Sequence, residues 1–150
     1  MKKFLIPCFL MGIVFISIAY GSVYKTLGDV KNAKNVYIEF AHYENHEQFY
    51  KKVEITNEKD KEYLKNLFGS TREYGELPCK CPADSISVIF DTNNGDYTFS
   101  FGVMGDHVNY ADVVGKFAYF SDNEYCDLLR FFLTFDEIGS YKRDILEFLE

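Results

Sequence analysis

The feature that most constrains the fold is a pair of alternating apolar segments joined by Asn94-Gly95. Asn-Gly is the preferred dipeptide of a two-residue type I′ turn, and such a turn fixes the register of the strands it connects. With these two residues as the loop, Phe90 would face Phe99, and further apolar pairs would follow on the same face. The other face is mostly polar, so the turn and the burial pattern agree. The sequence predicts an antiparallel hairpin with one buried and one wet face.

Other segments also alternate as half-buried strands do. Residues 36–41 alternate apolar and polar side chains, and residues 49–56 resume the pattern after a polar turn, so the second segment could return antiparallel to the first. Residues 116–120, rich in aromatic side chains, predict a last strand. Residues 107–110 either add a strand or cross the end of the sheet.

Capping residues and amphipathic patterns predict the helices. Asn57 is a good N-cap, and Gly69 ends the helix that it starts. Ser121, with Glu124 three residues later, forms a capping box before a strongly apolar helix, and Gly139 separates a final helix. The sequence therefore predicts an α+β domain: a mainly antiparallel sheet of four to five strands with two to three helices packed on one face.

The chain begins with the pattern of a secretory signal peptide, residues 1–21. Lys2 and Lys3 precede an apolar run over residues 4–20, and small residues precede a cleavage site after Gly21. An uncleaved anchor is the alternative, since the run is at the short end of what spans a bilayer core of about 30 Å. We expect a secreted or extracytoplasmic protein, in the periplasm or at the cell surface, with a membrane tether through residues 4–20 if the leader is kept.

The rest of the chain suits one domain. Residues 22–34 are polar, contain glycine and show little apolar periodicity, so we expect them to be a polar tether. Residues 35–150 would then form the single α+β domain, with the fold starting near Asn35.

Composition limits the classes of function. The chain carries 16 Lys and Arg against 23 Asp and Glu, a net charge of −7, and its longest basic clusters are the pairs Lys51-Lys52 and Lys142-Arg143. Binding to nucleic acid needs a basic patch that displaces counterions, so we expect no nucleic-acid partner. An acidic surface suits solubility, or docking to a basic protein partner. The 15 Phe and 12 Tyr are too many for a disordered chain, so much of this aromatic surface must be buried.

The cysteines beyond the leader give the sharpest chemical hypothesis. Cys79, Cys81 and Cys126 are odd in number in a compartment that favours oxidation, so at least one stays unpaired in a monomer. We expect a disulfide from Cys79 or Cys81 to Cys126, which would add about 3 to 5 kcal/mol by restricting the unfolded chain. A bridge between Cys79 and Cys81 is the alternative, and its strained small ring would be a readily reduced redox site.

No catalytic signature stands out, because the sequence contains no G-x-S-x-G, phosphate loop or dinucleotide fingerprint. We therefore expect a protein that is not an enzyme and uses neither a cofactor nor a metal. The leading hypothesis, by analogy of architecture alone, is a small exported protein-binding domain such as an inhibitor, an immunity-type protein or an envelope accessory protein. Exposed tyrosine rings supply contact area with a polar end, and the candidates for an interaction surface are Tyr43, Tyr50, Tyr110 and Tyr119.

Three alternatives stay open beside this hypothesis. The tyrosine rings could instead close the core. The chain could be a thiol redox or metal-handling protein that uses Cys79 and Cys81, although the paired spacing of a zinc site is missing. It could also be a carrier of a small ligand, with a pocket between the helices and the sheet.

Overall fold

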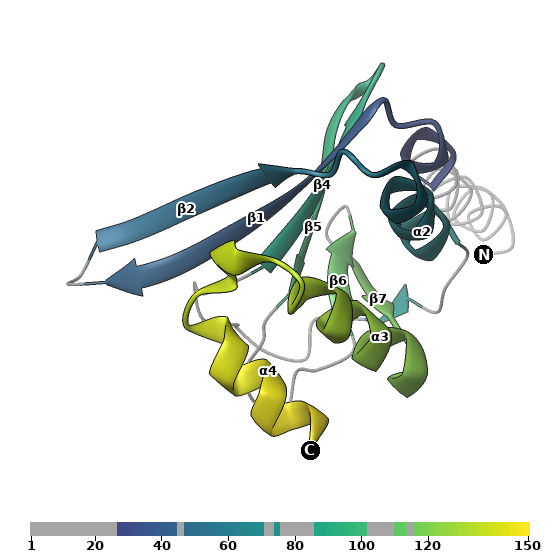
Figure 1. The fold of residues 1–150 in the computed structure, drawn as a ribbon. Coiled ribbons are helices and arrows are strands. Elements are labelled where there is room, and N and C mark those ends of the chain that lie inside the picture. The colour runs from purple at the N-terminus through teal and green to yellow at the C-terminus, as the bar shows by residue number, and fades with distance from the viewer. Residues whose placement is uncertain (1–26, 45–46, 71–73, 76–85, 102–109, 114–115) are drawn as a thin grey trace, which may run out of the picture.

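The computed structural model of the chain describes residues 27–44, 47–70, 74–75, 86–101, 110–113 and 116–150. They form an α+β arrangement whose larger sheet has four antiparallel strands in the order β2-β1-β4-β5 (Figure 1). Three short strands form a second antiparallel sheet in the order β3-β7-β6. The predicted fold class is confirmed.

Helical residues 27–31 precede the first strand. In chain order, the strands and helices are then β1 (Asn35–Glu44), β2 (Glu47–Glu54), α2 (Glu58–Phe68), β3 (Tyr74–Gly75), β4 (Ile86–Thr92), β5 (Gly95–Phe101), β6 (Tyr110–Val113), β7 (Lys116–Tyr119), α3 (Asp122–Phe132), a 3-10 turn (Asp136–Ile138) and α4 (Tyr141–Leu149). In the described part of the chain, no helix has the length and apolar character needed to cross a membrane. The predicted leader lies outside the described residues.

The core lies on one face of the larger sheet. The register places Val36 opposite Phe90 and Ile38 opposite Val88, and side chains that face each other across an antiparallel pair share a face. All four are fully buried. The helices cover this face with buried side chains of their own: Leu64, Leu67 and Phe68 of α2, Tyr125, Leu128, Leu129 and Phe132 of α3, and Tyr141 and Ile145 of α4.

One ring joins distant parts of this core. Phe68, at the end of α2, lies 5.5 Å from Phe90 of β4, 4.9 Å from Phe99 of β5 and 5.6 Å from Phe120, measured between ring centroids. Tilted and edge-on ring pairs at such distances are favourable beyond the area that they bury. The aromatic residues thus link a helix to two strands and to the residue that follows β7.

Local capping explains where the main helices begin. The Asn57 side chain accepts a hydrogen bond from the Lys59 N–H at 2.9 Å at the start of α2. Ser121 and Glu124 form both hydrogen bonds of a capping box at the start of α3. Gly139 has a φ of 56°, a conformation that favours glycine, just before α4. The predicted helix boundaries at these residues are confirmed.

The loop of the β4–β5 hairpin lies one residue earlier than predicted. Thr92 pairs with Gly95, so the two loop residues are Asn93 and Asn94. The Thr92 hydroxyl donates to the Gly95 carbonyl at 2.7 Å and accepts from the Asn94 N–H at 3.1 Å. Gly95 has a φ of 111°, a conformation that favours glycine. It is the first residue of β5, so this conformation lies where the chain enters the strand and not within the loop.

This earlier loop shifts the predicted pairing by two residues. Phe90 lies opposite Tyr97, and Val88 lies opposite Phe99, so the expected pair of Phe90 with Phe99 is wrong. A shift of two residues keeps every side chain on its predicted face, because side chains alternate with a period of two. The burial pattern therefore could not distinguish the two registers.

The predicted wet face of the hairpin is dry along β4. Ser87 and Ile89 on this face are only 6% and 8% exposed. The hydroxyls of Ser87 and Ser100 lie 2.9 Å apart and share a hydrogen bond across the strands. β4 is flanked by β1 and β5, whereas Thr98 on the outer strand β5 is exposed. The second face of a strand is thus buried where the strand lies between two others, and it is more exposed on an outer strand.

Residues 27–34 belong to the fold, which corrects the expectation that a tether extends to residue 34. Leu27, Val30 and Ala33 are at most 5% exposed. Leu27 and Val30 are three residues apart, which places them on one side of the short helical stretch, and Ala33 follows its end. The stretch has only five helical residues, too few to give a clear periodic signal in the sequence.

Asp29 fixes the same stretch to the hairpin. Its carboxylate accepts one hydrogen bond from the Asn94 side-chain amide and one from the Tyr97 hydroxyl, each at 2.9 Å. These partners lie on the loop and on β5, so Asp29 fixes the loop and the strand that follows it. This tertiary contact adds to the Thr92 bonds in favouring the observed register.

We expect Asp29→Ala to lower the free energy of unfolding by about 1 to 3 kcal/mol, because two hydrogen bonds to a carboxylate are lost. Asp127→Ala is the matched control, since its carboxylate contacts only the exposed Arg130 at 3.0 Å, and such pairs contribute about 0.5 kcal/mol or less. Urea unfolding at neutral pH compares the two variants. Equal losses would show that Asp29 does not hold the hairpin.

Alanine substitutions at two glycines on neighbouring helical segments should have opposite effects on stability. A Cβ at Gly69 would lie 2.6 Å from both the Lys31 Cγ and the Lys65 carbonyl oxygen, whereas nothing lies within 4 Å of a Cβ at Gly28. Gly69→Ala should therefore lower the melting temperature, with a cost of about 1 to 3 kcal/mol. Gly28→Ala should raise it, by up to about 1 kcal/mol, because alanine restricts the unfolded chain. Thermal unfolding of the two variants tests both expectations. Melting temperatures that shift in the same direction would contradict this packing.

Candidate functional site

The structure places one of the three cysteines predicted to carry chemistry. Cys126 lies on α3, and its side chain is half-buried. Cys79 and Cys81 lie outside the described residues, so the disulfide and the redox site stay predictions. Within the part of the chain that the structure describes, no three His, Cys, Asp or Glu side chains gather as a metal site would require.

The four tyrosines predicted to form an interaction surface lie on two different sheets. Tyr50 is on β2, and its side chain is 56% exposed. Tyr43 lies on β1 opposite Gln48, and Tyr110 of β6 lies opposite Tyr119 of β7. The side chains of Tyr43, Tyr110 and Tyr119 fall outside the described part. Tyr50 is therefore the residue on which a surface can be built.

The hairpin of β1 and β2 extends past the rest of the larger sheet. β4 pairs with β1 as far as Phe40, whereas β2 pairs with β1 as far as Glu44. Residues 41–44 and 47–50 therefore form a two-stranded arm. In Figure 1 this arm points away from α2 and α3. A projecting ribbon of this kind exposes far more of its surface than a strand inside the sheet.

The C-terminal part of the chain supports the base of the arm. The Tyr141 hydroxyl at the start of α4 donates a hydrogen bond to the carbonyl of Ala41, the first residue of the arm. The Phe135 ring lies 6.1 Å from the Phe40 ring, measured between centroids. Residues about a hundred positions apart in the sequence thus meet where the arm leaves the body.

β2 is an outer strand of the sheet, and no described strand pairs with its outer side. The Ile55 N–H donates to the Val36 carbonyl at 2.9 Å, in continuation of the same register. Along an antiparallel pair, residues that hydrogen-bond to the partner strand alternate with residues that point their N–H and C=O away. We call the outward-pointing set the β2 edge: Gln48, Tyr50, Lys52 and Glu54.

The β2 edge is long, regular and lightly protected. The register with β1 runs without a bulge over all eight residues of β2, and the strand contains no proline. Natural proteins guard outer strands with prolines, bulges and charged residues, above all lysine. β2 has neither a proline nor a bulge, but it has charged residues, of which Lys51 and Lys52 are exposed.

The two lysines lie on opposite faces of β2, because they are consecutive. The Lys52 Nζ lies 4.3 Å from the centroid of the Tyr37 ring on β1, a cation–π contact. In the register, Lys51 lies opposite Phe40 and Lys52 lies opposite Glu39. Neither lysine takes part in an ion pair with another described residue.

Exposed aromatic rings accompany these charges. Phe49 is 41% and Tyr50 is 56% exposed, on opposite faces of the strand. The other large apolar side chains of the described residues that are this exposed are Leu146 and Phe148, both on α4. Residues 49–52 therefore combine two exposed rings, two ammonium groups and an open strand edge within four positions.

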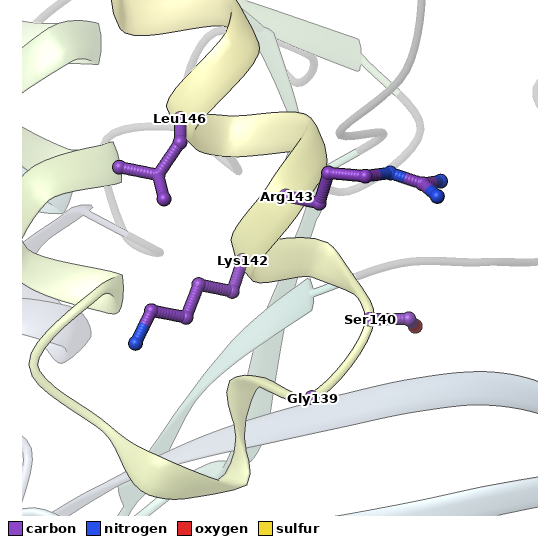
Figure 2. Close-up of a pocket in the computed structure, with 5 residues that line it drawn as sticks. All are labelled: Gly139, Ser140, Lys142, Arg143 and Leu146. Atoms are coloured by element: carbon purple, nitrogen blue, oxygen red, sulfur yellow. The ribbon is translucent and has the colours of Figure 1, made fainter.

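A hollow lies at the start of α4. It has a volume of about 470 Å³, and its five lining residues are all exposed. Figure 2 shows Lys142 and Leu146 on one side of the helix and Arg143 directed to the other side, where its Nε contacts Asp144 at 3.1 Å. A ligand carrier needs a pocket that encloses the ligand, with polar groups that converge on it. The hollow therefore gives the carrier hypothesis no support. Its lining is Gly139, Ser140, Lys142, Arg143 and Leu146.

Among the described residues, Tyr125 of α3 has the most strongly shifted pKa. The side chain is 1% exposed, and burial, with a smaller contribution from Cys126, raises the pKa of its hydroxyl. The hydroxyl has no hydrogen-bond partner among the described residues, and the ring packs edge-on against Phe148 at 5.6 Å. A shifted pKa indicates function when the group lies in a cleft with a specific charge partner. Tyr125 is buried in the core and does not line the hollow at α4, so we interpret it as a core residue.

Tyr125→Phe keeps the ring and removes the unsatisfied hydroxyl, so we expect the free energy of unfolding at pH 7 to rise by about 1 to 3 kcal/mol. The pKa of Tyr125 is higher in the folded protein than in the unfolded chain. Above pH of about 10 the unfolded chain therefore loses this proton first, and the wild type loses up to about 1.4 kcal/mol of stability per pH unit through this residue. The variant should lose less between pH 10 and 11. Urea unfolding at these pH values tests both expectations, and a steeper alkaline loss in the variant would contradict them.

Comparison with known proteins gives no match to this chain among protein-family models, curated proteins or solved structures.

Proposed function

We propose that this protein is an exported, non-enzymatic protein-binding domain that contacts its partner through the β2 edge and the exposed rings beside it. The observation that carries the proposal is the coincidence of an open eight-residue outer strand with the exposed side chains of Phe49 and Tyr50. A partner on this surface would receive main-chain hydrogen bonds and would cover both rings.

The exposed rings favour binding on energetic grounds. Removing a large apolar side chain from water contributes about 1.5 to 3 kcal/mol, and tyrosine is among the residues that most often dominate interface energies. On α4, the exposed Phe148 packs edge-on against Tyr125. Phe49 and Tyr50 lie on the arm that leaves the body of the protein.

The extracytoplasmic location proposed from the leader determines where the partner is sought. An inhibitor, an immunity-type protein or an envelope accessory protein acts by occupying the surface of another protein. Such a role requires a rigid, accessible contact region and no reacting groups. The β2 edge meets this requirement, because its register is fixed by full-length pairing with β1.

Affinity capture tests the proposed function. The full chain with a C-terminal tag is produced in its source cell, and the envelope and secreted fractions are captured with wild type, Tyr50→Ser and Leu146→Ser. Leu146 is 45% exposed on α4, so its variant is a matched control for loss of an exposed apolar side chain. We expect one near-stoichiometric protein with the wild type and the control, and at least about tenfold less with Tyr50→Ser, a loss of about 1.4 kcal/mol.

Thermal unfolding should show that both variants stay folded, because each replaced side chain is largely exposed. Retention of the same protein by all three forms would exclude the β2 edge as the contact surface. An empty column under gentle washing would reject protein binding itself.

A further inference from the structure

We infer that, in the free protein, the β2 edge is occupied by a second copy of this chain, whose β2 pairs with it antiparallel about a two-fold axis at Phe49. This inference goes beyond the proposed function, because it states what covers the edge before a partner binds. It follows from the open backbone groups, the order of charges along β2 and the shape of the arm. Since both use the same edge, the dimer and the partner complex exclude each other.

The backbone of the arm offers pairing groups that a second copy completes. Gln48 and Tyr50 each point one N–H and one C=O away from β1. In a two-fold register centred on Phe49, Gln48 lies opposite Tyr50 of the second copy, and Tyr50 lies opposite its Gln48. Each of these is a hydrogen-bonded pair, in which both residues donate an N–H to the carbonyl of the other. The two copies use the same edge, so the pairing closes as a dimer and does not propagate.

The charges along β2 fit this register. Within the arm, Glu47 lies opposite Glu44, another acidic residue, and Lys51 lies opposite Phe40. The second copy would place its Lys51 opposite Glu47 and its Glu47 opposite Lys51. Both residues would gain an opposite charge directly across the new pair of strands, which is stabilising. Centring the axis one residue later, on Tyr50, would lose both of these charge pairs.

The remaining two-fold registers fit β2 less well. Centring on Lys51 or on Lys52 would place like charges directly opposite each other. Centring on Val53 would match Lys52 with Glu54, but it would leave Phe49 outside the paired residues, because β2 ends at Glu54. The register about Phe49 is the one that combines opposite charges with coverage of both exposed rings.

The rings and the shape of the arm favour the same arrangement. Phe49 would face Phe49 of the second copy at a non-hydrogen-bonded position, where opposite Cα atoms are only about 4.5 Å apart and aromatic pairs are stabilising. The arm points away from α2 and α3 (Figure 1), so two arms can pair while the bodies lie at opposite ends. This separation limits the repulsion between two chains of net charge −7, because charges more than about 8 Å apart are largely screened at physiological salt.

Self-association of charge variants tests the inference. The full chain is produced in cells, purified and kept reduced, and its mass is followed by light scattering from micromolar to millimolar concentration. We expect a concentration-dependent dimer. Lys51→Glu should raise its dissociation constant at least about fivefold, because like charges replace both opposite-charge pairs. Adding Glu47→Lys to this variant should restore the constant to within about twofold of the wild-type value.

Lys52→Glu is the matched control. It makes the same change of charge one residue away, at a position that the register about Phe49 leaves opposite a residue outside β2. The dissociation constant should therefore stay within about twofold of the wild-type value. Both lysines are exposed, so thermal unfolding should show the two single variants folded.

A disulfide across the axis reports the register. Under mild oxidation, Phe49→Cys should give a covalent dimer, because residues that face each other with Cα atoms about 4.5 Å apart suit a disulfide. Tyr50→Cys is the control, since Tyr50 is more exposed than Phe49 but does not face itself in this register. The wild type shows any link through the natural cysteines. We expect Tyr50→Cys and the wild type to link at least about tenfold more slowly than Phe49→Cys.

The outcomes separate the inference from the proposed function. A protein that stays monomeric at millimolar concentration, equal weakening by Lys51→Glu and Lys52→Glu, no rescue by Glu47→Lys, or equal linking of Phe49→Cys and Tyr50→Cys would overturn pairing about Phe49. The capture experiment with Tyr50→Ser would then still decide whether the surface binds a partner. An empty capture column would reject the partner and leave the dimer standing.

Discussion

The structure depends on β1. One half of this strand lies between β2 and β4 in the larger sheet, and the other half forms the arm together with β2. Its inner half is fixed by complete burial, since Val36, Ile38 and Phe40 are at most 1% exposed. A slip of one residue would turn these side chains to the other face and would expose the core. The same strand continues into the arm and sets the register of β2. Burial at one end of β1 therefore determines which backbone groups of β2 face outward at the other end.

Local features of the sequence were enough to predict α2, α3 and α4, whereas the hairpin register was not predictable from them. Asn57 and Ser121 act within one turn of their own position, so their caps are visible in the sequence. The hairpin register depends in addition on Asp29, more than sixty residues away, and the five-residue helix that carries Asp29 is too short to recognise by periodicity. The tyrosine-rich segments pointed to Tyr50. The open edge beside it was not predictable, because it follows from the order of strands in the sheet.

The outer strand β2 combines two opposed requirements. An open, regular strand can bind a partner, but it is also a route to aggregation, and lysines are a common protection against aggregation. Lys51 and Lys52 supply this protection at exposed positions, so it is set without any change to the core.

The contact between Tyr141 and Ala41 has a consequence for the order in which the molecule forms. A protein chain is made from its N-terminus, so the strands of the arm emerge before α4 does. The base of the arm gains the hydrogen bond from Tyr141 only when α4 has emerged. The surface proposed for recognition is therefore completed late in the synthesis of the domain.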